Sequence, residues 1–393
     1  MRGAWLVPLV LVASCATRVP AALHGPPVDA PAACTGAALR PFTAPADPGV
    51  GGMLVTVSGE SLATQGYAFT PGSSTSQDPA FVDGWALTFE HILVSIDRVS
   101  LSTNPDGDPN DQRLAGDVVQ SASGPWAYDL ARPSPRAVTG KSGAPEKADP
   151  LASFAGLDPE TKYAFSFETV PAQPCAIDVN LDDATRALWA QMVAAGESIL
   201  FIGTATYQGD AACTSAGGHD FSKLPKAVRF QLGFASPTAY VNCQNPDLQG
   251  PPDSAFEEAP RGVQAKASAA ATAQLTFHTD HLFWDRLTHD RPLHFDPFAA
   301  AATAGGADVP LVTSDLLAKE DYNGFRYADG TPLAPRSCVA DFTPTPGAQL
   351  RFDPAGVAPL PSFLDYARYS QSTMGHLNAD GLCAVFRRYP SPL

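Results

Sequence analysis

The sequence predicts a mainly β fold, a β-sandwich with helical insertions and a loop-rich C-terminal extension. Two segments, Met53–Glu60 and Trp85–Ser102, alternate apolar and polar residues with the period of a strand. Both are rich in β-branched and aromatic side chains, which favour strands. The second segment is long for a single strand, so we expect it to be bent or to contain a β-bulge.

A proline turn that opens another alternating segment makes the prediction more specific. Leu157, Pro159 and Tyr163 match the tyrosine corner of immunoglobulin-like and fibronectin-like domains, in which the tyrosine hydroxyl bonds back to the backbone of the corner. This short motif predicts a sandwich of the immunoglobulin-like or fibronectin-like type.

The remaining elements are predicted from local patterns. The segment Asp183–Ala195 has an aspartate at its start, apolar residues on one face and Gly196 as its stop, which predicts a helix inserted in the body. Alternating or apolar runs predict further strands over residues 198–207, 227–235, 238–243 and 269–278. Short helices are expected within residues 311–322 and 362–373.

The N-terminus has the pattern of a secretory signal peptide, because one arginine precedes an apolar run that is too short to span a bilayer. Residues Val12 to Cys15 resemble the lipobox of bacterial lipoproteins, in which the cysteine is lipidated and becomes the new N-terminus. Residues 1–15 then form the signal peptide and the lipobox. The alternative is an ordinary signal peptide cleaved near Ala22. Ala16 stands where an aspartate would favour inner-membrane retention, so an outer-membrane or surface location is expected.

Composition divides the rest of the chain. Residues 16–51 are rich in Pro, Ala and Gly and predict a flexible spacer; 52–300 hold the sandwich body, and 301–393 form the extension packed on it. The sequence after the signal peptide contains no apolar segment long enough to cross a membrane. We therefore expect membrane contact through the lipid anchor only.

Charge and cysteine content limit the partners and the compartment. The formal net charge of -15 argues against nucleic acid and anionic membrane surfaces as partners and favours cations. No particular protein partner is indicated. Six cysteines follow Cys15, an even number that predicts disulfides in an exported protein. Proximity along the chain favours three pairs: Cys213 with Cys243, Cys338 with Cys383, and Cys34 with Cys175.

The stretch 276–295 holds four of the eight histidines and is the main candidate for chemistry. If a helix begins near residue 279, His281, Asp285 and His289 lie on one of its faces. His281 and His289 would be about 12 Å apart along the axis, so they cannot share a metal. The predicted site therefore combines His278 from a strand end with His281 and Asp285 from the helix.

Imidazole nitrogens with a carboxylate suit zinc, copper(II) or non-haem iron, and we expect zinc or copper. Asp280, His294 or His376 would supply the next ligand; His376 lies in a C-terminal loop beside a predicted disulfide. Two alternatives stay open. In the first, the histidines are core or capping residues, and a histidine–aspartate pair on the helix is an exposed interaction that adds little stability. In the second, His281 and Asp285 form a general acid–base pair.

A loop after the long strand is a weaker candidate, for a calcium site. Asp106, Asp108, Asn110 and Asp111 offer oxygens in a short loop that contains a glycine. The loop lacks the bidentate glutamate that ends an EF-hand loop, and a solvated turn accounts for the same residues. Calcium is therefore less favoured than zinc or copper.

No catalytic signature is complete in this sequence. It contains no G-x-S-x-G, P-loop, G-x-G-x-x-G or H-E-x-x-H motif, which removes the usual support for hydrolase, kinase, dinucleotide-binding and zincin functions. We therefore assign no catalytic residue.

Five segments spread over most of the body are GWALTFEHILVSI, NPDGDPNDQ, GPWAYDL, HTDHLFWD and GHLNADGLC. They resemble a group of uncharacterised secreted lipoproteins of myxobacteria-like bacteria. The layout of the strand, WAYDL and tyrosine-corner segments, over about a third of the chain, also resembles periplasmic copper-associated proteins encoded beside methanobactin genes. No metal ligand can be matched there, and neither resemblance implies an activity.

These observations favour a lipid-anchored binding protein of the cell envelope that holds a divalent transition metal at a strand-to-helix corner. The alternative is a structural or interaction module of the outer envelope without a ligand. A metal-dependent enzyme of unknown reaction is the least favoured of the three.

Overall fold

A computed structural model of the chain describes residues 22–26, 34–76, 79–210, 213–217, 221–252, 254–287, 292–304, 310–327, 329–356 and 360–389. The fold is mainly β, as the sequence predicts. The strands form a twelve-stranded sheet, a six-stranded sheet and a two-stranded sheet.

The strands are β1 Arg40–Pro41, β2 Met53–Ser58, β3 Trp85–Ser102, β4 Val118–Ala122, β5 Trp126–Asp129, β6 Val138–Thr139, β7 Lys147–Phe154, β8 Lys162–Thr169, β9 Ile177–Asp178, β10 Ile199–Tyr207, β11 Thr214–Ser215, β12 Ala227–Phe234, β13 Thr238–Val241, β14 Val263–Gln264, β15 Ala271–Phe277, β16 Leu311–Thr313, β17 Arg336–Ser337, β18 Gly375–Leu377, β19 Gly381–Leu382 and β20 Ala384–Arg387. The α-helices are α1 Glu60–Gln65, α2 Asp183–Ala195, α3 Asp296–Ala304, α4 Ser314–Leu317 and α5 Phe363–Gln371. The 3₁₀ helices are η1 Phe221–Lys223 and η2 Thr279–Phe283.

The long strand β3 organises the twelve-stranded sheet. Its first half pairs with β10, and the order β1-β9-β5-β3-β10-β12-β16 continues to both sides. Its second half pairs with β4 on one side and β8 on the other, and β8 leads on to β13 and β20. The register shifts between Asp97 and Ser100, where Arg98 has a left-handed backbone with φ 48°. The bulge expected in this segment is therefore present.

The six-stranded sheet has the order β19-β18-β15-β2-β7-β6. Its strands β15 and β2 are parallel, whereas β15 and β18 are antiparallel. Phe277 of β15 packs against Phe167 of β8 and Tyr240 of β13, with ring centroids 5.9 and 6.5 Å apart. The two large sheets therefore share one apolar core.

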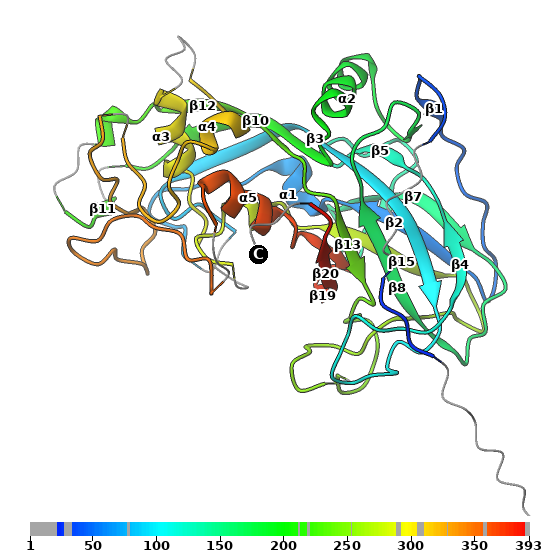
Figure 1. Cartoon of the computed structure of the whole chain (residues 1–393). Helices are drawn as coiled ribbons and strands as arrows, with labels where there is room; N and C mark the ends of the chain where they lie inside the picture. Colours follow the sequence, from blue (N-terminus) through cyan, green and yellow to red (C-terminus); the bar gives the residue numbers. More distant parts are fainter. Residues whose placement is uncertain are drawn as a thin grey trace, which may run out of the picture.

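Helix α2 covers the other face of the large sheet, above β3 and β10 in Figure 1. Trp189 and Met192 of α2 belong to a second apolar cluster with Leu93 and Leu200 of those strands. Residues of β3 are consequently buried on both faces from Ile92 to Asp97, a stretch that begins with the apolar run Ile92–Val94. This covering accounts for the run of apolar residues that interrupts the alternation.

The helix expected over Asp183–Ala195 is α2, and its ends have the local chemistry that the sequence suggests. The Asp182 side chain accepts a hydrogen bond from the backbone N–H of Thr185, and the Thr185 hydroxyl accepts one from the backbone N–H of Asp182. Gly196 ends the helix in a left-handed conformation with φ 68°, which glycine adopts without strain.

The hydrogen bond of a tyrosine corner is present. The hydroxyl of Tyr163 accepts a hydrogen bond of 3.0 Å from the backbone N–H of Asp158. Parallel pairs such as β2 with β15 and β12 with β16 are a departure from the antiparallel pattern of the domains in which that corner is known. The immunoglobulin-like or fibronectin-like type therefore stays a prediction.

The proposed spacer 16–51 is attached to the body in the parts that the structure describes. His24 forms a β-bridge with Ala115, and β1 pairs with β9. Cys34 is bonded to Cys175. The prediction of a free spacer is thus wrong for these parts, because a disulfide and backbone pairing hold a segment whose composition alone favours flexibility. The lipobox cysteine, Cys15, lies outside the described residues.

All six cysteines after Cys15 form disulfides, as predicted, but two of the three predicted pairs are wrong. Cys34 is paired with Cys175, as expected. The other bonds join Cys213 to Cys338 and Cys243 to Cys383. Proximity along the chain is a poor guide here, because the C-terminal segment folds back and brings Cys338 to Cys213 and Cys383 to Cys243.

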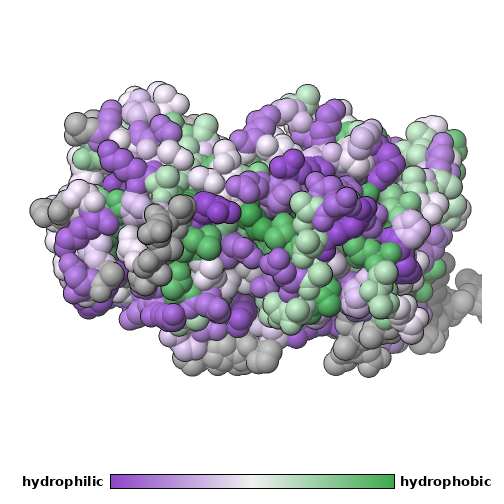
Figure 2. Space-filling model, turned by 90° about the horizontal axis from the view of Figure 1, so that it is seen from above, coloured by the Kyte–Doolittle hydropathy of each residue, from purple (hydrophilic) through white to green (hydrophobic). Residues whose placement is uncertain are grey.

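The C-terminal segment supplies strands to both large sheets as well as packing on the body. Strand β18 extends the six-stranded sheet beside β15, and β20 pairs with β13 of the large sheet. Helix α4 contacts both α3 and α5, and α3 and α4 lie toward the left of Figure 1 while α5 lies nearer its centre. In the view of Figure 2, hydrophilic and hydrophobic residues are intermixed over the surface. Among the described residues, no helix has the length and hydropathy needed to cross a bilayer.

Candidate metal centre

Three histidines from three elements meet at the end of the six-stranded sheet. His278 directly follows β15, His281 lies in η2, and His376 is in the middle of β18. The pairing of β15 with β18 sets Thr276 opposite His376, and the backbone N–H of His278 donates to the carbonyl of Met374. The sheet register therefore brings the C-terminal histidine to the strand end that carries the other two.

The three rings are close enough to share one ion. One ligand atom from each of the three lies within 4.8 Å of the others. The rings of His278 and His376 are stacked with centroids 4.2 Å apart, and the ring of His281 is edge-on to both. Nitrogens around one tetrahedral zinc would be about 3.3 Å apart, given bonds of about 2.0–2.1 Å. On binding, these nitrogens would have to approach one another by up to about 1.5 Å.

Hydrogen bonds fix one nitrogen of each ring. Nε2 of His278 lies 3.0 Å from the carbonyl oxygen of Ala379, and Nε2 of His376 lies 3.2 Å from that of Thr373. A carbonyl only accepts, so in the neutral rings both Nε2 atoms carry the hydrogen. Nδ1 of each ring then carries the lone pair that a metal needs.

The third ring is fixed by a hydroxyl. Nδ1 of His281 lies 2.7 Å from Oγ1 of Thr373, and that hydroxyl donates its hydrogen to the carbonyl of Ser370 at 2.7 Å. The hydroxyl therefore accepts from His281, so Nδ1 carries the hydrogen and Nε2 the lone pair. Oxygen partners of this kind orient histidines that bind metals and raise their basicity.

Acidic side chains surround the centre. Oε1 of Glu60, the first residue of α1, lies 3.8 Å from Nε2 of His278. Burial raises the pKa of Glu60, and His278 opposes that change. Burial alone would lower the pKa of His278, but Glu60 and Asp280 together raise it above its usual value. The carboxylates thus favour positive charge beside His278.

A tryptophan forms one wall of the centre. The ring of Trp284 stacks on His281 with centroids 3.8 Å apart, and its Nε1 donates to Asp280 at 3.0 Å. His281 and His376 are buried, and His278 is only partly exposed. Access of solvent to the three rings is therefore restricted, which strengthens electrostatic interactions within the site.

Two other predicted ligands, Asp285 and His294, lie outside this centre. The expected α-helix is a 3₁₀ helix of five residues, and Trp284 at its end is already extended. Residues His281 and Asp285 therefore do not share a helical face, and the prediction of Asp285 as a ligand is wrong. Asp280 borders the centre but is not one of the three converging groups. His289 lies outside the described residues.

Asp285 and His294 belong instead to a buried polar network. Nε2 of His294 lies 3.3 Å from Asp285, and its Nδ1 lies 3.8 Å from Asp83. Asp83 accepts the backbone N–H groups of Phe295 and Asp296 where α3 begins. Burial, with repulsion from Asp296, raises the pKa of Asp83 to about 7. The network holds the start of α3 against the body.

The proposed calcium loop uses its oxygens for local contacts. Asp108 accepts the backbone N–H of Asn110, and Asp111 pairs with Arg113 at 2.6 Å. Asp106 pairs with Lys162. The buried guanidinium of Arg261 also donates to the carbonyls of Pro105 and Asp108 from the inner side of the loop. These contacts suit a turn fixed by arginine better than a calcium site.

Glu60 and Thr373 are parts of the site that the sequence did not indicate. Glu60 was included only as the end of a predicted strand, and Thr373 only as the edge of a predicted short helix. Their signals are weak, because each acts through a tertiary contact that no local pattern encodes.

Comparison with models of protein families, with curated proteins and with solved structures found no match for this chain. The centre is therefore interpreted from its own geometry.

Proposed function

We propose that the protein is an exported metal-binding protein that holds one zinc or copper ion between His278, His281 and His376. The observation that carries this proposal is the convergence of three rings, each with one nitrogen bonded to an oxygen partner. In metal sites the second nitrogen of a ligating histidine has the same kind of partner. Acidic neighbours such as Glu60 would offset the charge of the ion.

The donor set favours zinc or copper over calcium. Imidazole nitrogen suits zinc, copper, iron and nickel, whereas calcium takes oxygen ligands. Copper(II) binds such sites more tightly than zinc, so copper should displace zinc from the protein. Three protein ligands also leave a fourth position for water or another molecule.

Titration of the metal-free protein tests the proposal. After removal of metals with EDTA, zinc chloride and copper(II) chloride are titrated separately by calorimetry. One ion per chain should bind, and each should raise the melting temperature by mass action on the folded state. Loss of the hydrogen-bond partner of a ligating side chain weakens metal binding by about 10–100-fold, so the loss of a ligand itself in His281→Ala or His376→Ala should weaken binding by at least that much.

A histidine outside the centre provides the control. His24 is exposed and pairs with Asp117, so His24→Ala should bind metal like the wild type. Equal stoichiometry and affinity in the wild type and in both centre variants would contradict the proposal. The protein would then be better described as a structural module of the envelope.

We infer that the protein is exported and held in the envelope by lipid on Cys15. Its three disulfides support an oxidising compartment, and the sequence Val12 to Cys15 supports lipidation. Cys15→Ser should leave unprocessed precursor in cells that express it, because the lipidated cysteine is lost. Normal processing of that variant, seen by immunoblotting, would contradict the lipid anchor.

A further inference from the structure

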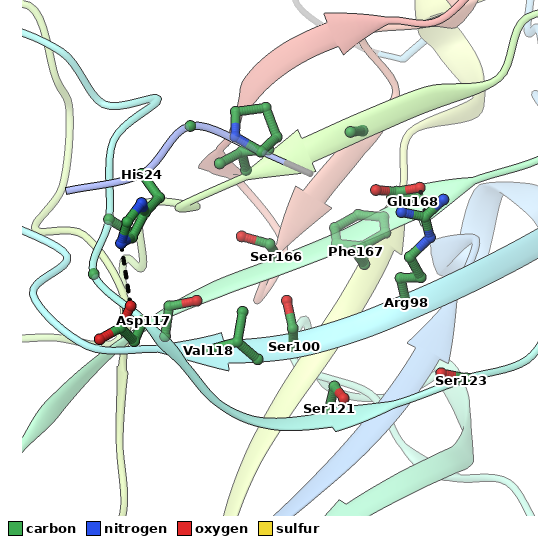
Figure 3. Close-up of a pocket in the computed structure, with 17 residues that line it drawn as sticks. His24, Arg98, Ser100, Asp117, Val118, Ser121, Ser123, Ser166, Phe167 and Glu168 are labelled. Carbon is green, nitrogen blue, oxygen red and sulfur yellow. Dashed lines mark ion pairs between the residues drawn. The ribbon is translucent and has the colours of Figure 1, made fainter. Parts of the chain in front are cut away.

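A second candidate site lies on one face of the large sheet, and none of His278, His281 and His376 lines it. It is a trough with a cavity volume of about 510 Å³, within the usual range of small-molecule sites of about 300–1,000 Å³. Strands β3, β4, β8 and β13 form its floor, and residues 24–26 border one end. Figure 3 shows the side chains that line it.

A row of serines crosses the floor of the trough. The register places Ser100 of β3 opposite Ser121 of β4 on one side and Ser166 of β8 on the other. Neighbouring strands are about 4.8 Å apart, so three hydroxyl groups follow one another at that spacing. Ser102 of β3 also lines the trough, since residues two apart share a face. Because serine side chains are small, they leave room for the trough, and their hydroxyl groups line its floor.

The charged groups of the trough compensate one another. At one end Glu168 lies 2.8 Å from Arg388 and 3.5 Å from Nε of Arg98. At the other end His24 pairs with Asp117 at 3.1 Å (Figure 3). Two arginines and two carboxylates thus lie in or beside the trough, so their charges sum to zero and favour a neutral ligand.

Glu168 also has an acceptor that points to a ligand. The residue is only 4% exposed, and its Oε2, which forms the ion pair with Nε of Arg98 at 3.5 Å, makes no hydrogen bond. A hydrogen bond from a ligand hydroxyl would add to that ion pair and satisfy the acceptor. The bulge at Arg98 places that side chain beside the carboxylate, on the same edge of the trough.

We propose that the trough binds a neutral, hydroxyl-rich small molecule of the size of a mono- or disaccharide. The serine row donates and accepts hydrogen bonds along the ligand, and Oε2 of Glu168 accepts from a hydroxyl at one end. Val118, which is 55% exposed at the rim, supplies an apolar contact. The proposal does not depend on metal binding, since it uses none of the three histidines.

Saturation-transfer NMR on the full protein tests the proposal with glucose, N-acetylglucosamine, maltose, cellobiose and trehalose as probes, and glucuronate as the charged comparison. At least one neutral sugar should receive saturation and bind in calorimetry, equally with and without zinc. Ser100→Leu fills the centre of the row and should weaken that binding at least tenfold. Ser153→Leu, on β7 of the other sheet, is the matched control and should bind like the wild type.

The exposed Ser121→Leu provides a second variant, because an exposed position tolerates leucine without loss of the fold. It should also weaken binding while melting like the wild type. The proposal is overturned if no neutral sugar binds, if glucuronate binds more tightly than every neutral sugar, or if Ser100→Leu and Ser121→Leu both bind like the wild type.

Discussion

Thr373 connects two of the three histidines of the metal centre. Its hydroxyl accepts from Nδ1 of His281, and its carbonyl accepts from Nε2 of His376. The same hydroxyl donates to Ser370, so its role toward His281 is fixed. One residue between α5 and β18 thus sets the tautomers of two candidate ligands.

Thr373→Val should weaken metal binding without removing a ligand. Valine has nearly the same shape but cannot accept from Nδ1 of His281, so the ring loses its orienting partner. We expect the affinity for zinc to fall by about 10–100-fold and the free energy of unfolding of the metal-free protein to fall by about 1 kcal/mol. Thr272→Val, at an exposed position of β15, is the control. Unchanged affinity in Thr373→Val, measured by calorimetry, would contradict this role.

Residue types and local spacing selected His278 and His281 as candidate ligands, and His376 was one of three residues considered for a further position. They were not sufficient to separate these from Asp285 and His294, which lie in the same stretch. The separation depends on where the chain turns after Phe283, and therefore on tertiary packing. Local patterns carry no such information.

The element that decides the ligand set is η2. A single 3₁₀ turn has a different periodicity from an α-helix, and Trp284 ends it so that its ring packs against His281. The backbone then pairs Trp284 with Leu293 as a β-bridge. The strands β2, β3 and β10 were predictable because their alternation is long, whereas a five-residue element between aromatics was not.

The turn between α2 and β10 carries an acid whose ionisation should affect stability. Burial raises the pKa of Glu197 from 4.5 to about 7, and repulsion from Asp315 of α4 adds to the change. The folded state therefore binds this proton more tightly than the unfolded state. The stability that the protonated Glu197 contributes to the folded state is fully present below about pH 4.5 and is lost as the pH rises through about 7.

Glu197→Gln should remove that dependence, because glutamine stays neutral. The variant should be more stable than the wild type at pH 8 and differ little from it at pH 4.5, as measured by urea unfolding. Asp315→Asn should increase the free energy of unfolding at pH 8 by less, since it removes only the repulsion from Asp315 and not the burial of Glu197. A Glu197→Gln variant that is less stable than the wild type at pH 8 would refute this account.

On the scale of the whole molecule, the C-terminal segment completes both large sheets. Strand β18 brings His376 to the centre, and β20 pairs with β13. The disulfide joins Cys243, which follows β13, to Cys383, which precedes β20. The sequence predicted a loop-rich extension here, because strands of two to four residues leave almost no periodic signal. The metal centre therefore depends on contacts between distant parts of the chain.

Loss of this disulfide should affect metal binding as well as stability. The double variant Cys243→Ser with Cys383→Ser releases the end of the segment that carries His376, so both the free energy of unfolding and the zinc affinity should fall. The cost in stability is about 2–5 kcal/mol. The matched variant Cys213→Ser with Cys338→Ser should lower stability by a similar amount but leave zinc affinity in the folded protein nearly unchanged. Equal loss of affinity in both variants would contradict the argument.

The most direct test of the metal centre is anomalous diffraction from crystals of the protein loaded with zinc, with data collected on both sides of the zinc absorption edge. The account predicts one anomalous peak at about 2.0–2.1 Å from Nδ1 of His278, Nε2 of His281 and Nδ1 of His376. A peak at other residues, or fully loaded crystals without a peak between these three rings, would contradict it.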